Sequence, residues 1–206
     1  MQRLYINVCK RFWVWVLMSS VTFFSKIKLA GCLGLVGAIA LSMGDRAVAQ
    51  STVPDTTLGS ESSSVSPAFP GSTVDEISGG AIRGSNLFHS FQKFNVDAGR
   101  SAFFSRPGDI KNIVTRVTGN ERSNILGTLG VYGKANLFLI NPNGISFGPN
   151  ATLSLEGSFM ATTANAIQFG DRGLFSAFNP EAPAAILTVD PSALLFNQIS
   201  AQSITN

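Results

Sequence analysis

The chain has 206 residues, of which 45% are hydrophobic and 13% are charged, and its net charge is +3. Domains usually contain about 100–150 residues, so we expect one folded domain and a leader rather than two domains. Residues 1–49 hold six basic residues and one acidic residue, a balance of +5, which leaves −2 of the total +3 for residues 50–206. Because the domain itself is mildly acidic, its composition argues against a nucleic-acid partner.

Residues 1–49 have the pattern of an extended signal peptide. A basic start and an apolar stretch from Leu29 to Met43 precede Ala47, Val48 and Ala49. These three residues form the A-x-A pattern that signal peptidase cleaves. We therefore expect a helical signal peptide that engages the general secretion machinery and is cut between Ala49 and Gln50.

Two alternatives for the leader are weaker. A second apolar run, Phe12 to Phe24, leaves room for a retained anchor, but each run is shorter than the roughly 20 residues that cross a bilayer. Leu29 to Cys32 resembles a lipoprotein box, yet the better apolar core follows the box instead of preceding it. The two cysteines, Cys9 and Cys32, both lie in the leader. The exported chain is therefore expected to contain no disulfide and no thiolate metal site.

Residues 50–72 are rich in Ser, Thr and Pro and contain few large apolar side chains. Such a segment does not build a core of its own. Two interpretations stay open: a flexible spacer, or an edge strand at Ser51–Pro54 that covers the end of a sheet.

Residues 73–198 consist of short apolar runs, each closed by Gly, Asn, Asp or Pro, and residues 199–206 form a tail. Alternation places Ile145 and Phe147 on one face of a strand. It places Leu153 and Leu155 together in the same way, so these runs are predicted to be half-buried strands. The clearest runs are Asn136–Ile140, Ile145–Phe147, Ala151–Leu155 and Ser158–Ala161.

The predicted fold class is all-β. Very short strands, frequent Gly and Asn, and few two-residue hairpin signals favour a parallel β-helix over a stack of hairpins. Such a helix needs caps at both ends. The repeat is too degenerate to assign a fixed period.

The segment Asn141 to Gly144 is predicted to form a tight turn. Pro142 sets φ at the second turn position, and Asn143 suits the third. Gly144 is expected to adopt a positive φ, which glycine tolerates without steric cost.

Several segments match one family in order and spacing, over about Val74 to Phe196. They are Ile77–Gly80, Arg83–Phe91, Phe94–Val96, Val117–Gly119 and Asn136–Gly148. Together they resemble the filamentous haemagglutinin N-terminal domain of two-partner secretion, most closely its cyanobacterial versions. The most specific element is Asn141-Pro142-Asn143-Gly144-Ile145.

This resemblance implies a right-handed parallel β-helix with short additional β elements, and no catalysis or cofactor. It implies a protein that passes through the periplasm to the cell surface or the medium. Its implied partner is an outer-membrane β-barrel transporter with periplasmic transport-associated domains. Family members continue into long adhesin or toxin passengers, so a chain that stops at Asn206 is expected to be a truncated product, a fragment or a free-standing secretion module.

The turn motif, defined as Asn141 to Ile145, has two compatible interpretations. It is a turn that the β-helix requires, or it is in addition a recognition element for the transporter. A rigid exposed turn on a strand scaffold is a natural docking feature.

Candidate catalytic and metal-binding residues are few. Asp97, Asp109, Asp171 and Asp190 each stand alone in a turn context, whereas a polysaccharide-cleaving β-helix needs paired carboxylates or a calcium-binding cluster. His89 is the only histidine, and it lacks the neighbours of a metal site. We expect these five residues to be structural.

The chain is therefore not expected to be an enzyme. The main hypothesis is a secretion-targeting domain. The alternative is a free-standing surface adhesin or carbohydrate-binding β-helix module whose partners are host or surface glycans, and a β-helix polysaccharide lyase ranks third. Core packing explains the sixteen phenylalanines better than a sugar-binding platform does.

Overall fold

The computed structural model describes residues 51–197 and 202–206, which belong to one compact unit, Ala47–Asn206. Their regular structure is β except for one 3₁₀ turn, Gly59–Glu61. The predicted signal peptide and its cleavage site lie outside the described residues, as does Cys32. In the described part of the chain, no helix has the length and apolarity needed to span a membrane.

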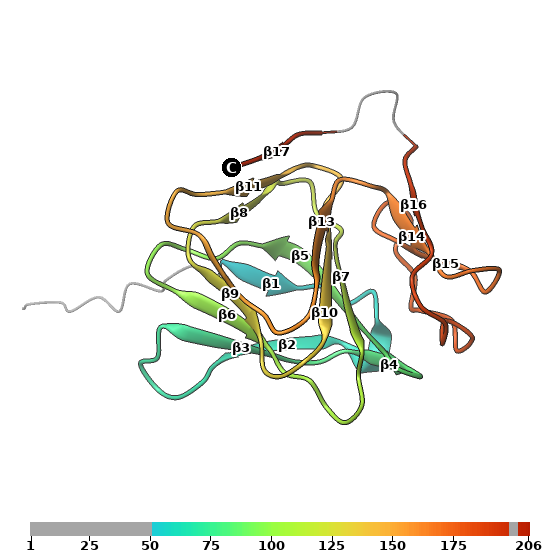
Figure 1. Cartoon of the computed structure of the whole chain (residues 1–206), viewed down its shortest axis with the longest axis horizontal. Coiled ribbons are helices and arrows are strands. Elements are labelled where there is room, and N and C mark those ends of the chain that lie inside the picture. The colour runs from blue at the N-terminus through green and yellow to red at the C-terminus, as the bar shows by residue number, and fades with distance from the viewer. Residues whose placement is uncertain (1–50, 198–201) are drawn as a thin grey trace, which may run out of the picture. The chain divides into compact units, whose positions relative to one another are not determined.

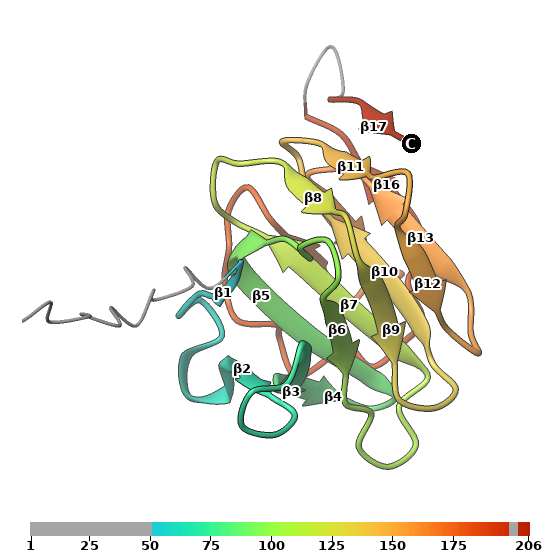
Figure 2. The same ribbon diagram turned by 90° about the vertical axis from the view of Figure 1, so that its left-hand side faces the viewer.

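The chain winds into a β-solenoid of about three turns, which confirms the expected parallel β-helix. Successive turns add parallel strands to three sheets, called A, B and C. Figure 2 shows β5, β7 and β10 of sheet A running side by side. The strands of sheet A are β1 (Thr52–Pro54), β4 (Ala81–Arg83), β5 (Asn86–Phe94), β7 (Asn112–Val117), β10 (Asn136–Ile140) and β13 (Phe159–Thr162).

Sheets B and C complete each coil, and a small antiparallel sheet D follows the last one. Sheet B contains β2 (Ser63–Pro67), β3 (Val74–Gly79), β6 (Ser101–Phe104), β9 (Thr128–Val131) and β12 (Thr152–Ser154). Sheet C contains β8 (Ser123–Ile125), β11 (Ile145–Phe147) and β17 (Ile204–Thr205). Sheet D contains β14 (Ala166–Gln168), β15 (Leu174–Ser176) and β16 (Ala193–Leu195).

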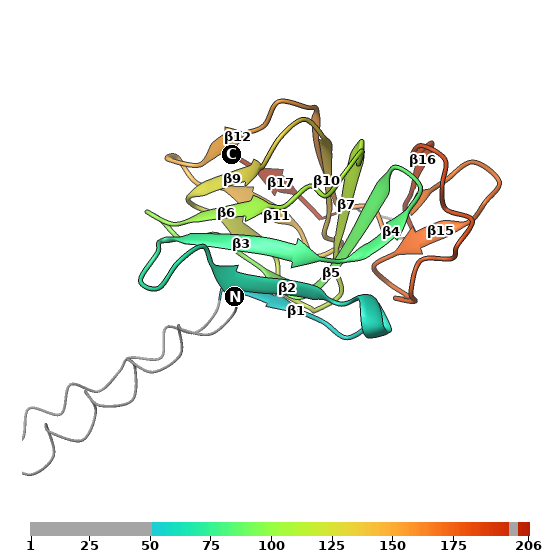
Figure 3. The same ribbon diagram turned by 90° about the horizontal axis from the view of Figure 1, so that it is seen from below.

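The N-terminal segment covers the first coil. Strand β1 pairs antiparallel with β5, and β2 pairs antiparallel with β3. Figure 3 shows β1 and β2 lying along this end of the solenoid. The edge-strand interpretation of Ser51–Pro54 is therefore confirmed, and the flexible-spacer interpretation is wrong.

Sheet A separates two hydrophobic cores, because alternate side chains of its parallel strands point to opposite faces. Leu87, Phe91 and Ile113 lie in the core inside the solenoid. Phe88 and Val114 lie in a second core between sheet A and the extension, defined as residues 165–197. Figure 1 shows β14, β15 and β16 of this extension on the side of sheet A away from sheet B.

One face of sheet A is covered by the inner core and the other by the extension. All six residues of β7 are therefore buried, as expected for a parallel sheet that is covered on both faces.

The last coil departs from the predicted alternation. Ile145 is buried and Phe147 packs on the inner core, as predicted, and Leu155 does so too. Leu153, however, is 47% exposed. Its strand β12 pairs only with β9 at the edge of sheet B, so no further strand of that sheet covers it.

An asparagine ladder runs across the start of the sheet A strands. Asn112 Nδ2 donates to Asn86 Oδ1 at 2.9 Å, and Asn136 Nδ2 donates to Asn112 Oδ1 at 3.0 Å. The Ser158 amide then donates to Asn136 Oδ1 at 2.9 Å. The ladder also binds the extension, because Asn86 Nδ2 donates to the Leu187 carbonyl at 2.9 Å. These side chains therefore fix the register of successive coils.

Replacing the central ladder residue should destabilise the domain. Asn112→Ala leaves Asn86 and Asn136 without their buried partner, and we expect the free energy of unfolding to fall by roughly 2–4 kcal/mol. Urea denaturation of the purified protein measures this. Asn150→Ala, at an exposed turn position, is the control and should change stability by less than about 0.5 kcal/mol. Equal effects of the two variants would show that the ladder does not stabilise the fold.

Candidate functional site

The turn motif lies between β10 and β11 and is held by its own side chains. Asn141 is fully buried. Its Nδ2 donates to the Glu121 carbonyl and to Ser123 Oγ, both at 3.0 Å, and its Oδ1 accepts from the Asn143 amide at 2.9 Å. The Gly144 amide donates to the Asn141 carbonyl at 3.1 Å. These bonds close the turn and attach it to the preceding coil.

The other motif residues strengthen this attachment. Asn143 Nδ2 donates to the Gly119 carbonyl at 2.7 Å. Gly144 has a φ of 106°, which confirms the predicted positive φ. Only Asn143 is partly exposed, whereas the other four motif residues are buried. The expectation of an exposed docking turn is therefore wrong for most of the motif, because these residues fill the space between adjacent coils.

His89 lies inside the solenoid, on the face of β5 opposite to Phe88, as the alternation predicts. It is fully buried, and its ring lies 5.2 Å from Phe104 and 6.2 Å from Phe91. Its Nδ1 is 3.0 Å from Ser63 Oγ, while Nε2 makes no hydrogen bond within the described part of the chain. Burial lowers the pKa of His89 to about 3, so the ring is neutral at physiological pH.

Arg116 joins three separate segments of the chain through its guanidinium group. Its Nε donates to Ser90 Oγ at 2.9 Å, within sheet A. Its Nη2 donates to Thr57 Oγ1 in the N-terminal segment at 2.8 Å. Its Nη1 donates to the Ser176 carbonyl, and Nη2 also donates to the Glu181 carbonyl, both at 2.8 Å in the extension. The side chain is fully buried.

The surroundings of Arg116 keep it charged. The guanidinium carbon lies 4.1 Å from the centre of the Phe175 ring, a cation–π arrangement. Burial lowers the pKa of Arg116 to about 10, while the charges of Asp55 and Glu181 act to raise it. The guanidinium is therefore protonated at neutral pH and keeps all its donors.

Asp55 supplies the negative charge near this cation. Its carboxylate accepts hydrogen bonds from Thr118 Oγ1 at 2.6 Å, Ser90 Oγ at 2.7 Å and Thr57 Oγ1 at 2.7 Å. Burial alone would raise the pKa of Asp55, but these hydrogen bonds outweigh it and hold the pKa below the ordinary value of 3.8. We call Arg116 and Asp55 with their hydrogen-bond partners the clamp.

The four aspartates considered for a lyase occupy separate places. Asp97 lies in a turn, where its carbonyl accepts from the Arg100 amide. Asp190 Oδ1 accepts from Asn112 Nδ2 at 2.9 Å, and Asp171 is paired with Arg172. Residues 51–197 and 202–206 contain no group of three or more His, Cys, Asp or Glu side chains that could hold a metal ion.

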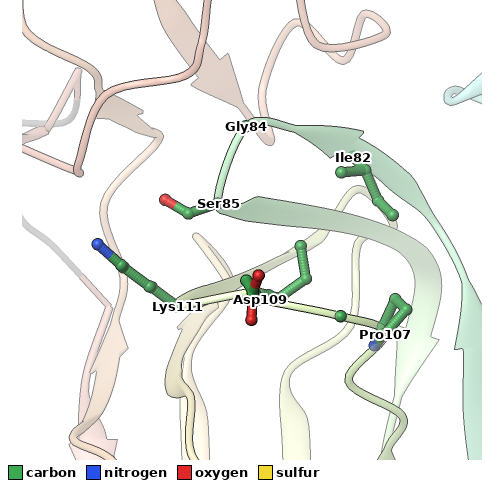
Figure 4. Close-up of a pocket in the computed structure, with 8 residues that line it drawn as sticks. Ile82, Gly84, Ser85, Pro107, Asp109 and Lys111 are labelled. Carbon is green, nitrogen blue, oxygen red and sulfur yellow. The ribbon is translucent and has the colours of Figure 1, made fainter.

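Asp109 lines a cleft of about 430 Å³ beside the β4–β5 turn. In Figure 4 the loop that carries Pro107, Asp109 and Lys111 faces the segment from Ile82 to Ser85. This cleft is lined by one carboxylate and one ammonium group and by no aromatic ring. It therefore lacks the paired acids that glycoside hydrolysis requires.

A comparison with protein families matches residues 50–205 to the TPS secretion domain, the domain of two-partner secretion. The chain belongs to the TPS secretion domain family. A search of curated proteins gives no match. The part that matches the TPS domain includes every described strand of the solenoid and the extension.

Only some of the important residues of this TPS domain could be found from the sequence. The sequence predicts the tight turn of the turn motif, and the structure confirms it. Arg116 carries a visible signal, since an arginine within the apolar run 113–117 is unusual for a strand buried on both faces. The partners of Arg116 come from positions 57, 90, 176 and 181, and no local pattern connects these.

The clamp should make stability depend on pH through Asp55. Its folded pKa is lowered, so its contribution is present above about pH 4 and is lost as the pH falls through the folded value. Asp55→Asn should lower the free energy of unfolding by about 1–3 kcal/mol at pH 7. The difference in free energy of unfolding between the variant and the wild type should become smaller below about pH 4. Denaturation at several pH values measures this. Asp171→Asn, whose side chain is 93% exposed, should show no such dependence.

His89 should add a second dependence on pH. Its folded pKa is about 3 and its ordinary value is 6.5, so between these values the unfolded chain binds a proton that the folded chain does not. Wild-type stability should fall as the pH decreases below 6.5, with a slope from this group approaching about 1.4 kcal/mol per pH unit. His89→Gln should remove that slope whatever its stability at pH 7. Parallel curves for the two proteins would contradict the prediction.

Proposed function

We propose that this protein is the secretion-targeting domain of a two-partner-secretion exoprotein. Its partner would be an outer-membrane β-barrel transporter, whose periplasmic transport-associated domains recognise it on the way to the cell surface or medium. The observation that carries the proposal is the TPS match over residues 50–205. That match begins at the first residue after the predicted cleavage site, which supports an arrangement of leader followed by secretion domain.

The absence of thiols from residues 50–206 is consistent with this route. A disulfide formed in the oxidising periplasm would close a loop in the chain. A chain that must pass a narrow pore unfolded would then be blocked. The domain instead relies on the ladder, the clamp and its two hydrophobic cores, which all come apart on unfolding.

For the turn motif we propose a role in recognition through the coil that it stabilises. Four of its five residues are buried, so the transporter has little of the motif to contact. Asn141 and Asn143 bind the carbonyls of Glu121 and Gly119. The motif thereby holds the turn of the preceding coil in place, and that turn carries the exposed Glu121 side chain, which pairs with Lys93 at 2.8 Å.

Two variants of the motif and one matched control test this role. Gly144→Val forces a side chain into positive φ with its Cβ 3.2 Å from the Ser203 carbonyl, at a cost of about 1–3 kcal/mol. Asn143→Asp replaces the donor to Gly119 by an acceptor. Asn150→Asp makes the same chemical change at an exposed position in the neighbouring turn.

We expect Gly144→Val and Asn143→Asp to lower both thermal stability and the amount of protein in the medium, while Asn150→Asp changes neither. Immunoblotting of medium and periplasm, together with thermal melts, measures the two effects. If Asn143→Asp abolishes secretion but keeps wild-type stability, the transporter reads the motif directly. If secretion is unchanged in cells that lack every outer-membrane transporter with transport-associated domains, the proposed function itself is wrong.

A further inference from the structure

A second cleft lies on the outer face of sheet B, away from the turn motif and the clamp. Its volume is about 410 Å³, within the range of roughly 300–1,000 Å³ that small-molecule sites occupy. Pro107, in the loop after β6, lines both this cleft and the cleft of Figure 4. The lining residues are Ser78, Gly79, Ser105, Arg106, Pro107 and Tyr132.

An exposed aromatic ring forms one wall of this cleft. Tyr132 is 46% exposed, and its ring stacks on Phe103 at 4.8 Å with an interplanar angle of 15°. Phe103 can lie flat on the sheet because Gly130 stands opposite it, where a Cβ would come within 2.3 Å of the Phe103 ring. The Phe103 ring covers Gly130, which accounts for the position of Phe103 on the sheet. This contact does not account for Tyr132, whose outer part is left open to solvent.

Arg106 supplies a positive charge beside this ring. Its Nη1 donates to the carbonyls of Gly108 and Ile110, which fixes the guanidinium on its own loop. Nε is buried without a partner and lies 3.2 Å from where a Cβ of Gly133 would stand, so a glycine makes room for it. Among the described residues no carboxylate lies within salt-bridge distance of Arg106, and Nη2 makes no hydrogen bond.

The hydroxyl groups of the cleft complete its chemistry. Ser105 Oγ donates to Glu76 Oε1, so toward the cleft Ser105 can only accept a hydrogen bond, as from a ligand hydroxyl. Ser78 adds a second hydroxyl. The face of the Tyr132 ring carries partial negative charge, which favours the polarised C–H groups of a sugar ring. The free Arg106 donors favour an anion, carboxylates above all.

From this combination we propose that the cleft binds an acidic saccharide, namely a glycan that contains uronic acid. One pyranose ring stacks on Tyr132, its hydroxyls bind Ser78 and Ser105, and its carboxylate binds Nη2 of Arg106. The cleft of Figure 4 lacks the aromatic wall, and its cation, Lys111, shares the space with Asp109. This inference is independent of the proposed secretion function.

Titration with two matched sugars tests the proposal. The protein is purified after expression of the whole chain, and binding of a galacturonic acid trisaccharide is followed by calorimetry and NMR. Its methyl ester keeps the sugar rings and hydroxyls, lacks the negative charges and carries one added methyl group on each carboxyl. We expect the acid to bind with a Kd of about 1 mM or lower and the ester to bind at least about tenfold more weakly.

Variants then locate the site. Tyr132→Leu keeps an apolar contact with Phe103 but removes the aromatic face, and Arg106→Gln removes the charge. Each should weaken binding of the acid by about tenfold or more. Thermal melts show whether each variant stays folded. If Arg106→Gln shifts its loop, Tyr132→Leu still tests the site. The controls are Phe178→Leu, a 63% exposed ring on the extension, and Arg172→Gln, an exposed arginine paired with Asp171; both should bind like wild type.

Three outcomes would overturn the proposal. The first is no binding of the trisaccharide at millimolar concentration, and the second is equal binding of acid and ester. The third is equal loss of binding in the control variants, which would show an unspecific charge effect. If the saccharide proposal is overturned, the proposed secretion function still stands, because neither Arg106 nor Tyr132 belongs to the turn motif or the clamp.

Discussion

The buried guanidinium of Arg116 is the interaction on which the arrangement of the domain depends. It binds one coil of the solenoid, the N-terminal segment and the extension at the same time. Removing a charged group from water is costly unless nearly all of its donors are satisfied. Arg116 therefore requires Thr57, Ser90 and the extension carbonyls to be in place together, and it couples the capping of the first coil to the docking of residues 165–197.

This coupling explains why sheet A has two cores and sheet B has one. The extension is held at the ends of the sheet A strands, by Arg116 at one end and by the asparagine ladder at the other. Between these two anchors Phe88, Phe169 and Phe175 pack as one aromatic cluster. No comparable segment among the described residues covers the outer face of sheet B, so Tyr132 stays open to solvent there.

The turn motif and the clamp show two ways in which polar residues specify a solenoid. In the motif, Asn141 binds a neighbouring coil through its side chain and closes its own turn through its backbone carbonyl. In the clamp, one side chain binds two segments, each about 60 residues away from it in the sequence, one before it and one after it. Buried polar groups of this kind favour a single register, because any slip would leave donors and acceptors unpaired.

The sequence by itself determined the all-β class, the strands Asn136–Ile140 and Ile145–Phe147, and the turn between them, because alternation and turn chemistry are local properties. It also contains a repeat whose meaning the structure reveals: Asn86, Asn112 and Asn136 each precede two apolar residues, at spacings of 26 and 24. Only the tertiary structure decided that the turn motif is buried, that residues 52–54 pair with β5, and that Arg116 meets Glu181. These outcomes depend on which coils and segments become neighbours, and that is set by packing over long sequence separations.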